Sequence, residues 1–164
     1  MSALAKRVAL AAVGLVVVIQ AFRPARTNPP IDAKQELAAT ANVDASVRSI
    51  IDRSCNDCHS NRTVWPWYSE VAPVSWLLGS DVDGGRRHMN FSEWGTYPGY
   101  KHKDLLDKMC KEVTSRGMPL WQYLLVHRNA ALSDSDRNAI CSWTKEAGQS
   151  AASAAAFQPL ATHN

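Results

Sequence analysis

The chain has 164 residues, of which 46% are hydrophobic and 20% charged, a composition that fits one globular domain and excludes wholesale disorder. Lys6, Arg7 and Arg23 account for the whole formal net charge of +3, because residues 1–23 contain no acid. The rest of the chain is therefore neutral overall. This argues against a nucleic-acid-binding domain, and four cysteines are too few for a disulfide scaffold.

The N-terminus has the pattern of an export segment. Lys6 and Arg7 precede an apolar run from Val8 to Phe22 that only Gln20 interrupts. No small-residue cleavage site follows, so we expect residues 1–23 to form an uncleaved membrane-anchor helix. A removed signal peptide and a buried core helix are the alternatives. An anchor or a removed signal peptide would each place the remaining chain outside the cytoplasmic membrane.

Two segments flank the predicted folded domain, which covers residues 32–147. Residues 24–31 contain three prolines and are typical of an extended Pro-rich linker. Residues 148–164 are rich in Ala, Ser and Gln and carry no Lys, Arg, Asp or Glu, so we expect a flexible tail. The chain thus divides into an anchor, a linker, one domain and a tail.

The domain itself is predicted to be all-α, since no stretch alternates apolar and polar residues as a strand would. Apolar residues recur at helical spacing in four segments. The first buries Val43, Val47, Ile50 and Ile51 and ends near Ser54; the others cover about 73–87 (burying Val74, Leu77 and Leu78), 102–116 (Leu105, Leu106, Met109, Cys110, Val113) and 133–147 (Ile140, Trp143). Residues 90–100 are expected to form an irregular loop. Gly117 is expected as the left-handed residue that ends the third helix, and Ser133 with Asp136 resembles a capping box.

The chemistry lies in Cys55-Asn56-Asp57-Cys58-His59. A C-x-x-C-H motif is typical of c-type haem attachment, in which two thiols form thioethers with the porphyrin edge and the adjacent histidine binds the iron. A disulfide, a thioredoxin-like redox pair and half of a zinc site are the alternatives. A thioredoxin motif needs a βαβ setting, and a zinc site needs a second ligand pair; the sequence offers neither. The motif therefore predicts one covalently attached haem c.

Met118 is the best candidate for the second iron ligand. It lies between Gly117 and Pro119, at the predicted end of a helix and far along the chain from His59. A thioether ligand raises the reduction potential and is typical of electron carriers. A methionine that only fills a gap in the core is the alternative.

Three histidines and one methionine rival Met118 for that position. They are His88, His102, His127 and Met89. His102 lies between two lysines and is expected on the solvated surface, whereas His127 is expected in a hydrogen-bonded structural role.

Longer stretches around these residues resemble the bacterial haem-binding domain family. The matching segments are CNDCHSNRTVWPWYSEVAPVSWLL from Cys55 to Leu78, HMNFSEW from His88 to Trp94, GMPL from Gly117 to Leu120 and VHRNAALS from Val126 to Ser133. The similarity covers roughly residues 8–147 and departs at Arg128, where proline would be expected. It implies a small cytochrome-c-like helical domain with Cys55 and Cys58 as thioether sites and His59 as proximal ligand.

Aromatic and basic residues near the motif are candidates for the haem wall and for its propionates. Trp65, Trp67, Tyr68 and Trp76 offer flat rings with polar donors, and Arg62, Arg86 and Arg87 offer guanidinium groups that match carboxylates. Ordinary core packing for each tryptophan and a solvated position for each arginine are the alternatives. Trp65, Trp67 and Arg86 are the ones we expect at the cofactor.

Cys110 and Cys141 remain outside the motif. In an exported domain they form either a disulfide, which would close a loop of about 30 residues and contribute about 3–4 kcal/mol, or two separately buried thiols. The sequence leaves both possibilities open.

These observations favour a membrane-anchored monohaem cytochrome that transfers single electrons, with an unidentified redox protein as its partner and no catalytic residues. A haem-based sensor or ligand-binding module with an open or displaceable sixth position is the alternative from another class. A peroxidase-like enzyme is a third, with His88 or His127 as distal base. The identity of the sixth ligand discriminates among them.

Overall fold

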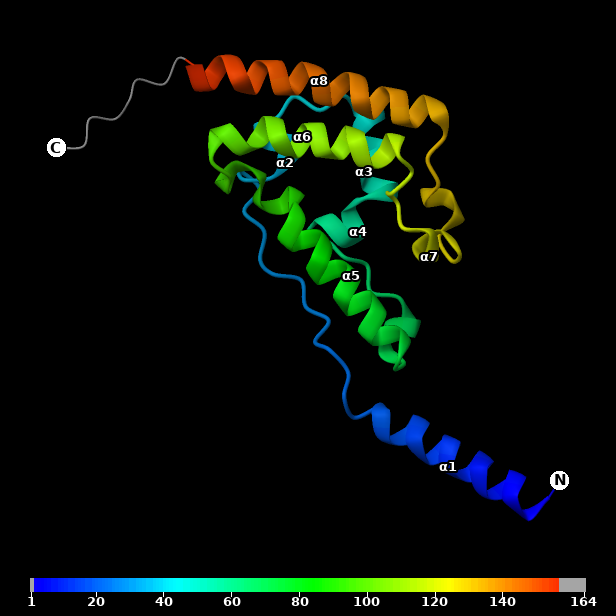
Figure 1. The fold of residues 1–164 in the computed structure, drawn as a ribbon. Helices are drawn as coiled ribbons and strands as arrows, with labels where there is room; N and C mark the ends of the chain where they lie inside the picture. Colours follow the sequence, from blue (N-terminus) through cyan, green and yellow to red (C-terminus); the bar gives the residue numbers. More distant parts are fainter. Residues whose placement is uncertain (1, 157–164) are drawn as a thin grey trace.

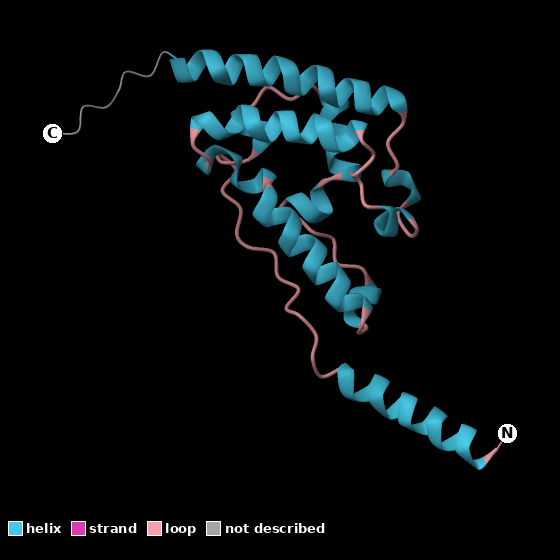
Figure 2. Ribbon diagram, viewed as in Figure 1, coloured by secondary structure: helices cyan, strands magenta, loops and turns pink. Residues whose placement is uncertain are grey.

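The structure is a computed structural model that describes residues 2–156. In that range the chain is helical and contains no strand, which confirms the all-α prediction (Figures 1 and 2). The elements in chain order are α1 (Ala3–Ile19), α2 (Leu37–Thr40), α3 (Ala45–Ser54), α4 (Asn56–His59), η1 (Trp67–Glu70), α5 (Val74–His88), η2 (Phe91–Thr96), α6 (Gly99–Thr114), α7 (Trp121–Leu124), η3 (Arg128–Ala130) and α8 (Asp134–Ala156), where η denotes a 3₁₀ helix.

The core lies between α3, α6, α8 and η2. Helices α6 and α8 run antiparallel along the top of the view in Figure 1, and α3 packs against α8. Their apolar stripes fall where the helical spacing predicts: Val47, Ile50 and Ile51 from α3, Leu105, Leu106, Met109 and Val113 from α6, and Ile140 and Trp143 from α8. Trp143 also satisfies its indole N–H, which donates to the carbonyl of Asn42 at 2.8 Å.

Helix α5 buries a different face from the one its apolar residues predict. Val74 and Leu77 are 40% and 47% exposed, and Leu78 is only half-buried, so the expectation that they are core residues is wrong. The buried positions are small ones, Ser75, Gly79, Val82 and Gly85. A Cβ on Gly79 would lie 2.9 Å from the ring of Pro24, so the small face lets the linker approach closely.

The linker follows α5 and is held there by side chains. Arg86 donates hydrogen bonds to the carbonyl of Thr27 at 3.0 Å and to Asn28 Oδ1 at 2.9 Å, and Asn28 Nδ2 donates to the carbonyl of Thr63. The segment is extended, as its prolines predict. It is therefore a strap on the domain surface and not a free tether.

Helix α1 projects from the domain, and none of its side chains is buried (Figure 1). Its leucine and valine residues, from Leu4 to Val18, are all more than half exposed. Within residues 2–156, no helix has the combination of length and apolar character that crossing a membrane requires.

Several element ends differ from the predicted ones. The segment expected to be an irregular loop contains η2, and α6 begins at Gly99, directly after Pro98. Helix α8 starts with the predicted capping box, in which the backbone N–H groups of Ser133 and Asp136 each donate to the other's side chain. It continues to Ala156 because alanine favours the helix, so residues 148–156 are not a loose tail; residues 157–164 lie outside the described part.

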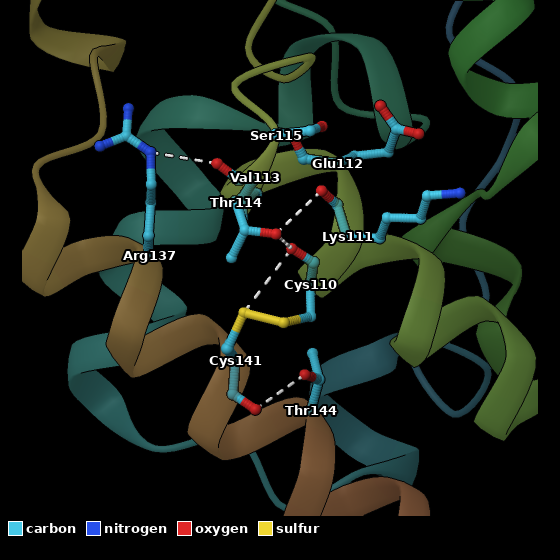
Figure 3. Close-up of a disulfide and its surroundings, with 9 residues drawn as sticks. All are labelled: Cys110, Lys111, Glu112, Val113, Thr114, Ser115, Arg137, Cys141 and Thr144. Atoms are coloured by element: carbon cyan, nitrogen blue, oxygen red, sulfur yellow. Dashed lines mark hydrogen bonds between the residues drawn. A yellow bond between two sulfur atoms is a disulfide. The ribbon is translucent and has the colours of Figure 1, made fainter.

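Cys110 of α6 and Cys141 of α8 form a disulfide, with their Cα atoms 4.8 Å apart (Figure 3). This decides between the two possibilities that the sequence leaves open. Arg137 of α8 donates to the carbonyl of Val113 at 3.0 Å, one turn along the same helix pair. The two long helices are thus joined covalently and by hydrogen bonding at one end of the core.

We predict that Cys110→Ser/Cys141→Ser lowers the free energy of unfolding by about 2–4 kcal/mol, because the bridge restricts the unfolded chain. Urea denaturation of the oxidised protein measures this. Wild type treated with a thiol reductant should lose a similar amount, while the variant should not respond. Equal stability of oxidised wild type and variant would contradict the prediction.

Candidate cofactor-binding site

The C-x-x-C-H motif forms a single helical turn between α3 and α5. Helix α3 ends at Ser54, Cys55 breaks it with φ −129°, and α4 follows at once. The N–H groups of Cys58 and His59 both donate to the carbonyl of Cys55, at 3.2 and 3.0 Å. This turn brings Cys55, Cys58 and His59 to the wall of one cavity.

The cavity has a volume of about 680 Å³, within the range of roughly 300–1,000 Å³ typical of ligand and cofactor sites. Its walls come from α4, the C-terminal half of α5, α6 and the segment before α7. Apolar side chains of α6 form one wall, namely Leu105, Met109 and Val113. Met118 lines the same cavity, so the structure brings together the four residues that carry the sequence-based haem site.

His59 is held in the state that binds a metal. Its Nδ1 lies 2.9 Å from the carbonyl oxygen of Met89, and because a carbonyl only accepts, Nδ1 carries the proton and donates. Nε2 therefore keeps its lone pair, as in metal-binding histidines whose other nitrogen is hydrogen-bonded. Burial lowers the pKa of His59, which keeps the ring neutral at pH 7.

The two motif cysteines are partly buried and are not bonded to each other. Burial is the main cause that raises the pKa of each thiol to about 12. The thiols are thus protonated at neutral pH, unlike the reactive thiolates of redox enzymes. Both remain available for thioether bonds.

Met118 follows the end of α6. The backbone turns at Arg116, which adopts a left-handed φ of 61°, and the N–H groups of Gly117 and Met118 both donate to the carbonyl of Glu112. The prediction that Gly117 takes the left-handed position is therefore wrong by one residue. The shared acceptor fixes the backbone of Met118 at the cavity edge.

The rival ligands divide into two groups. His88 and Met89, at the end of α5, line the same cavity as Met118. His102 stacks on Trp94 with ring centroids 5.2 Å apart, so the expectation of a solvated surface residue is wrong. His127 lies between the Tyr68 hydroxyl at 3.2 Å and the Tyr123 carbonyl at 3.3 Å, which confirms its hydrogen-bonded structural role.

The structure does not bring Trp65, Trp67 or Arg86 to this cavity. Trp67 is 79% exposed near the start of α5, and Trp65 is half-buried. Arg86 donates to the carbonyl of Ser60 and to Thr63 Oγ1 as well as to the linker, which engages its guanidinium on the opposite side of the motif.

Two of the other candidates from the sequence have partners elsewhere. Arg62 pairs with Glu36 at 2.8 Å, and the indole N–H of Trp76 donates to the carbonyl of Phe22. Arg87 is exposed at the end of α5. Arg62 and Arg86 therefore bind other parts of the chain.

Tyr123 and Asp57 are site residues that sequence reasoning missed. The Tyr123 hydroxyl donates to Asp57 Oδ2 at 2.7 Å, and the N–H of Val64 donates to Asp57 Oδ1 at 3.1 Å. Burial, and then Asp57, raises the pKa of Tyr123 above its ordinary value, so it stays a donor. The bond joins the segment after Met118 to the C-x-x-C-H turn, and its only sequence signal is a carboxylate inside the motif.

Gly85 of α5 lies against the backbone of Cys58. A Cβ at this position would lie 2.9 Å from the carbonyl carbon and 3.1 Å from the Cβ of Cys58, closer than side chains tolerate. The absence of a side chain therefore allows α5 to carry Met89 to His59.

We predict that Gly85→Ala reduces haem content and lowers the free energy of unfolding by about 1–3 kcal/mol, because the methyl group pushes α5 away from Cys58. Haem absorbance per protein and urea denaturation measure the two effects. Gly99→Ala is the control, since a Cβ there meets open space. Equal behaviour of the two variants would refute the close-approach argument.

A family model described as the haem-binding domain matches residues 14–146, which include the motif turn, the cavity and most of α8. No curated protein matches the chain, and no solved structure does. The matched region covers most of the chain and contains every residue discussed at the cavity. The chain therefore belongs to the haem-binding domain family.

Proposed function

We propose that this protein is a monohaem c-type cytochrome that passes single electrons at the periplasmic face of a bacterial inner membrane. One observation carries the proposal: Cys55, Cys58, His59 and Met118 line one cavity of cofactor size. Two free thiols, a neutral imidazole and a thioether are the donor set that a covalently bound, six-coordinate haem requires.

The residues present fit the group. Cys55 and Cys58 would hold it through thioether bonds, and His59 Nε2 and Met118 Sδ would ligate its iron. Haem bound in this way supplies a one-electron couple between ferrous and ferric iron.

In this function the chain itself holds the haem, orients the residues that ligate its iron and gives it partly apolar surroundings. The carbonyl of Met89 orients the His59 ring and fixes its tautomer. Leu105, Met109 and Val113 of α6 give the cavity an apolar lining, and Tyr123 ties the Met118 segment to the motif turn through Asp57. A soft thioether ligand and apolar surroundings both favour the ferrous state, as a carrier of moderately high potential needs.

A second candidate function rests on His88. This histidine lines the same cavity as Met118 and is exposed at the end of α5. If Met118 leaves the iron, His88 could ligate in its place or act as a distal base over an open position. The protein would then be a haem sensor, a ligand-binding module or a peroxidase-like enzyme.

Two features support a place outside the cytoplasm. Lys6 and Arg7 lie near the start of α1, an exposed helix that is apolar beyond them, which is the pattern of an export segment that holds the domain at the membrane. The disulfide between α6 and α8 is of the kind that forms and persists in oxidising compartments. We propose that α1 stays attached and binds the membrane.

The covalent bond to haem is tested on a denaturing gel stained for haem peroxidase activity. Wild type should show a stained band at its own mass. Cys55→Ser/Cys58→Ser should lose the band, and Cys110→Ser/Cys141→Ser should keep it. Complete extraction of haem from wild type by acidified acetone would exclude thioether attachment.

The role of Met118 is tested by absorption spectroscopy and redox titration. Ferric wild type should be low-spin and show the weak far-red sulfur-to-iron band. Met118→Ala should abolish the band, admit carbon monoxide to ferrous iron and lower the reduction potential, because the thioether favours ferrous iron. Met89→Leu and His88→Ala should retain the band. If His88→Ala alone makes the iron high-spin, His88 is the ligand, and this result favours the second candidate function over electron transfer.

A further inference from the structure

The N-terminal end of α5 and the segment before it expose an unusual concentration of large apolar side chains. We call this the tip surface. Its members are Trp67, Val71, Val74, Trp76 and Leu77, each 40% exposed or more. Trp67 is the most exposed of them at 79%, although most tryptophans in folded proteins are largely covered.

The tip surface is also almost without charge. Glu70 is the one charged residue between Val64 and Leu78, and its carboxylate lies 2.9 Å from the guanidinium of Arg26. Several large apolar side chains exposed on two elements in contact, η1 and α5, are typical of an interaction site. Tryptophan in particular is enriched where one side of a protein meets the lipid–water boundary.

The tip surface is joined directly to the end of α1. Gln20 both donates to the carbonyl of Ala72 and accepts from its N–H, at 3.1 and 3.0 Å. Arg23 donates to the carbonyl of Glu70 at 2.7 Å. Figure 1 shows the result: the N-terminal end of α5 lies beside the C-terminal end of α1. A membrane or protein surface that contacts the C-terminal end of α1 would therefore also contact the tip surface.

We propose that the tip surface inserts into the headgroup–acyl boundary of the phospholipid bilayer that α1 binds. The inference rests on the proposed function, in which α1 holds the protein at a membrane. Arg26 is paired with Glu70, which leaves Arg23 at the margin of the tip with the positive charge that anionic headgroups attract. Trp67 and Trp76 supply the amphipathic rings that prefer this depth.

This contact would orient the whole domain. The tip lies at the N-terminal end of α5, whereas the cavity-lining residues of α5 run from Ser80 to Met89, in its C-terminal half and just beyond. Lipid contact at the tip would therefore leave the cavity-lining half of α5 farther from the bilayer than the tip itself.

The test compares hydrogen–deuterium exchange of the full haem-loaded chain in nanodiscs of phosphatidylcholine and phosphatidylglycerol. Trp67→Glu/Leu77→Glu places charges on the tip, and Tyr100→Glu places one on an equally exposed aromatic at the start of α6. Peptides from 63–73 should lose their protection in the double variant only. Peptides from α1 should stay equally protected in all three proteins.

The outcomes separate this inference from the proposed function. Equal exchange of the tip peptides in all three proteins, with α1 protected, would overturn lipid contact and leave membrane binding by α1 intact. Failure of wild type to enter nanodiscs would overturn both. Tip protection that rises with the number of copies per disc would assign the surface to a second copy and overturn lipid contact.

The haem absorption spectrum must be unchanged in each variant, which shows that the domain is folded. If the double variant lacks haem, Trp67→Ser replaces it, because it removes the exposed ring without adding charge. A partial loss of tip protection in Trp67→Ser supports lipid contact, and unchanged protection overturns it.

Discussion

The contact between α5 and the C-x-x-C-H turn is the constraint on which the site depends. Gly85 lies so close to Cys58 that no side chain fits between them, and this closeness places the carbonyl of Met89 within hydrogen-bond distance of His59. One missing Cβ thus determines the orientation and the tautomer of the candidate iron ligand. The contact of α5 with the motif turn also fixes the direction of this helix. The N-terminal end of α5, which carries the tip surface, therefore lies beside α1.

The opposite side of the cavity is organised by a different bond. Tyr123 donates to Asp57, which lies inside the motif, so the chain that carries Met118 is attached to the turn that carries His59. The C-terminal end of α6 holds the same chain by accepting two N–H groups at the carbonyl of Glu112. The two faces of the cavity are therefore joined through protein contacts as well as through any bound group.

The parts that could be predicted from the sequence are those whose signal is local. The cysteine spacing, the apolar stripes of α3, α6 and α8 and the capping box at Ser133 each depend on neighbours a few residues away. The position of Arg86 could not be predicted, because its partners Thr27 and Ser60 are distant along the chain. Leu77 was misleading for a related reason: its apolar character indicates burial, and only the assembled domain shows that α5 buries its small residues instead.

The strap formed by residues 24–30 has a consequence for how the cavity is presented. Arg86 binds the strap on one side and the carbonyl of Ser60, just past the motif, on the other. Insertion or deletion of one residue in the strap would do more than change its length. It would move the carbonyl of Thr27 away from Arg86 and put another residue in its place. The position of the cavity relative to α1 is consequently fixed by these bonds, because Arg86 connects the strap to the residue that follows the motif.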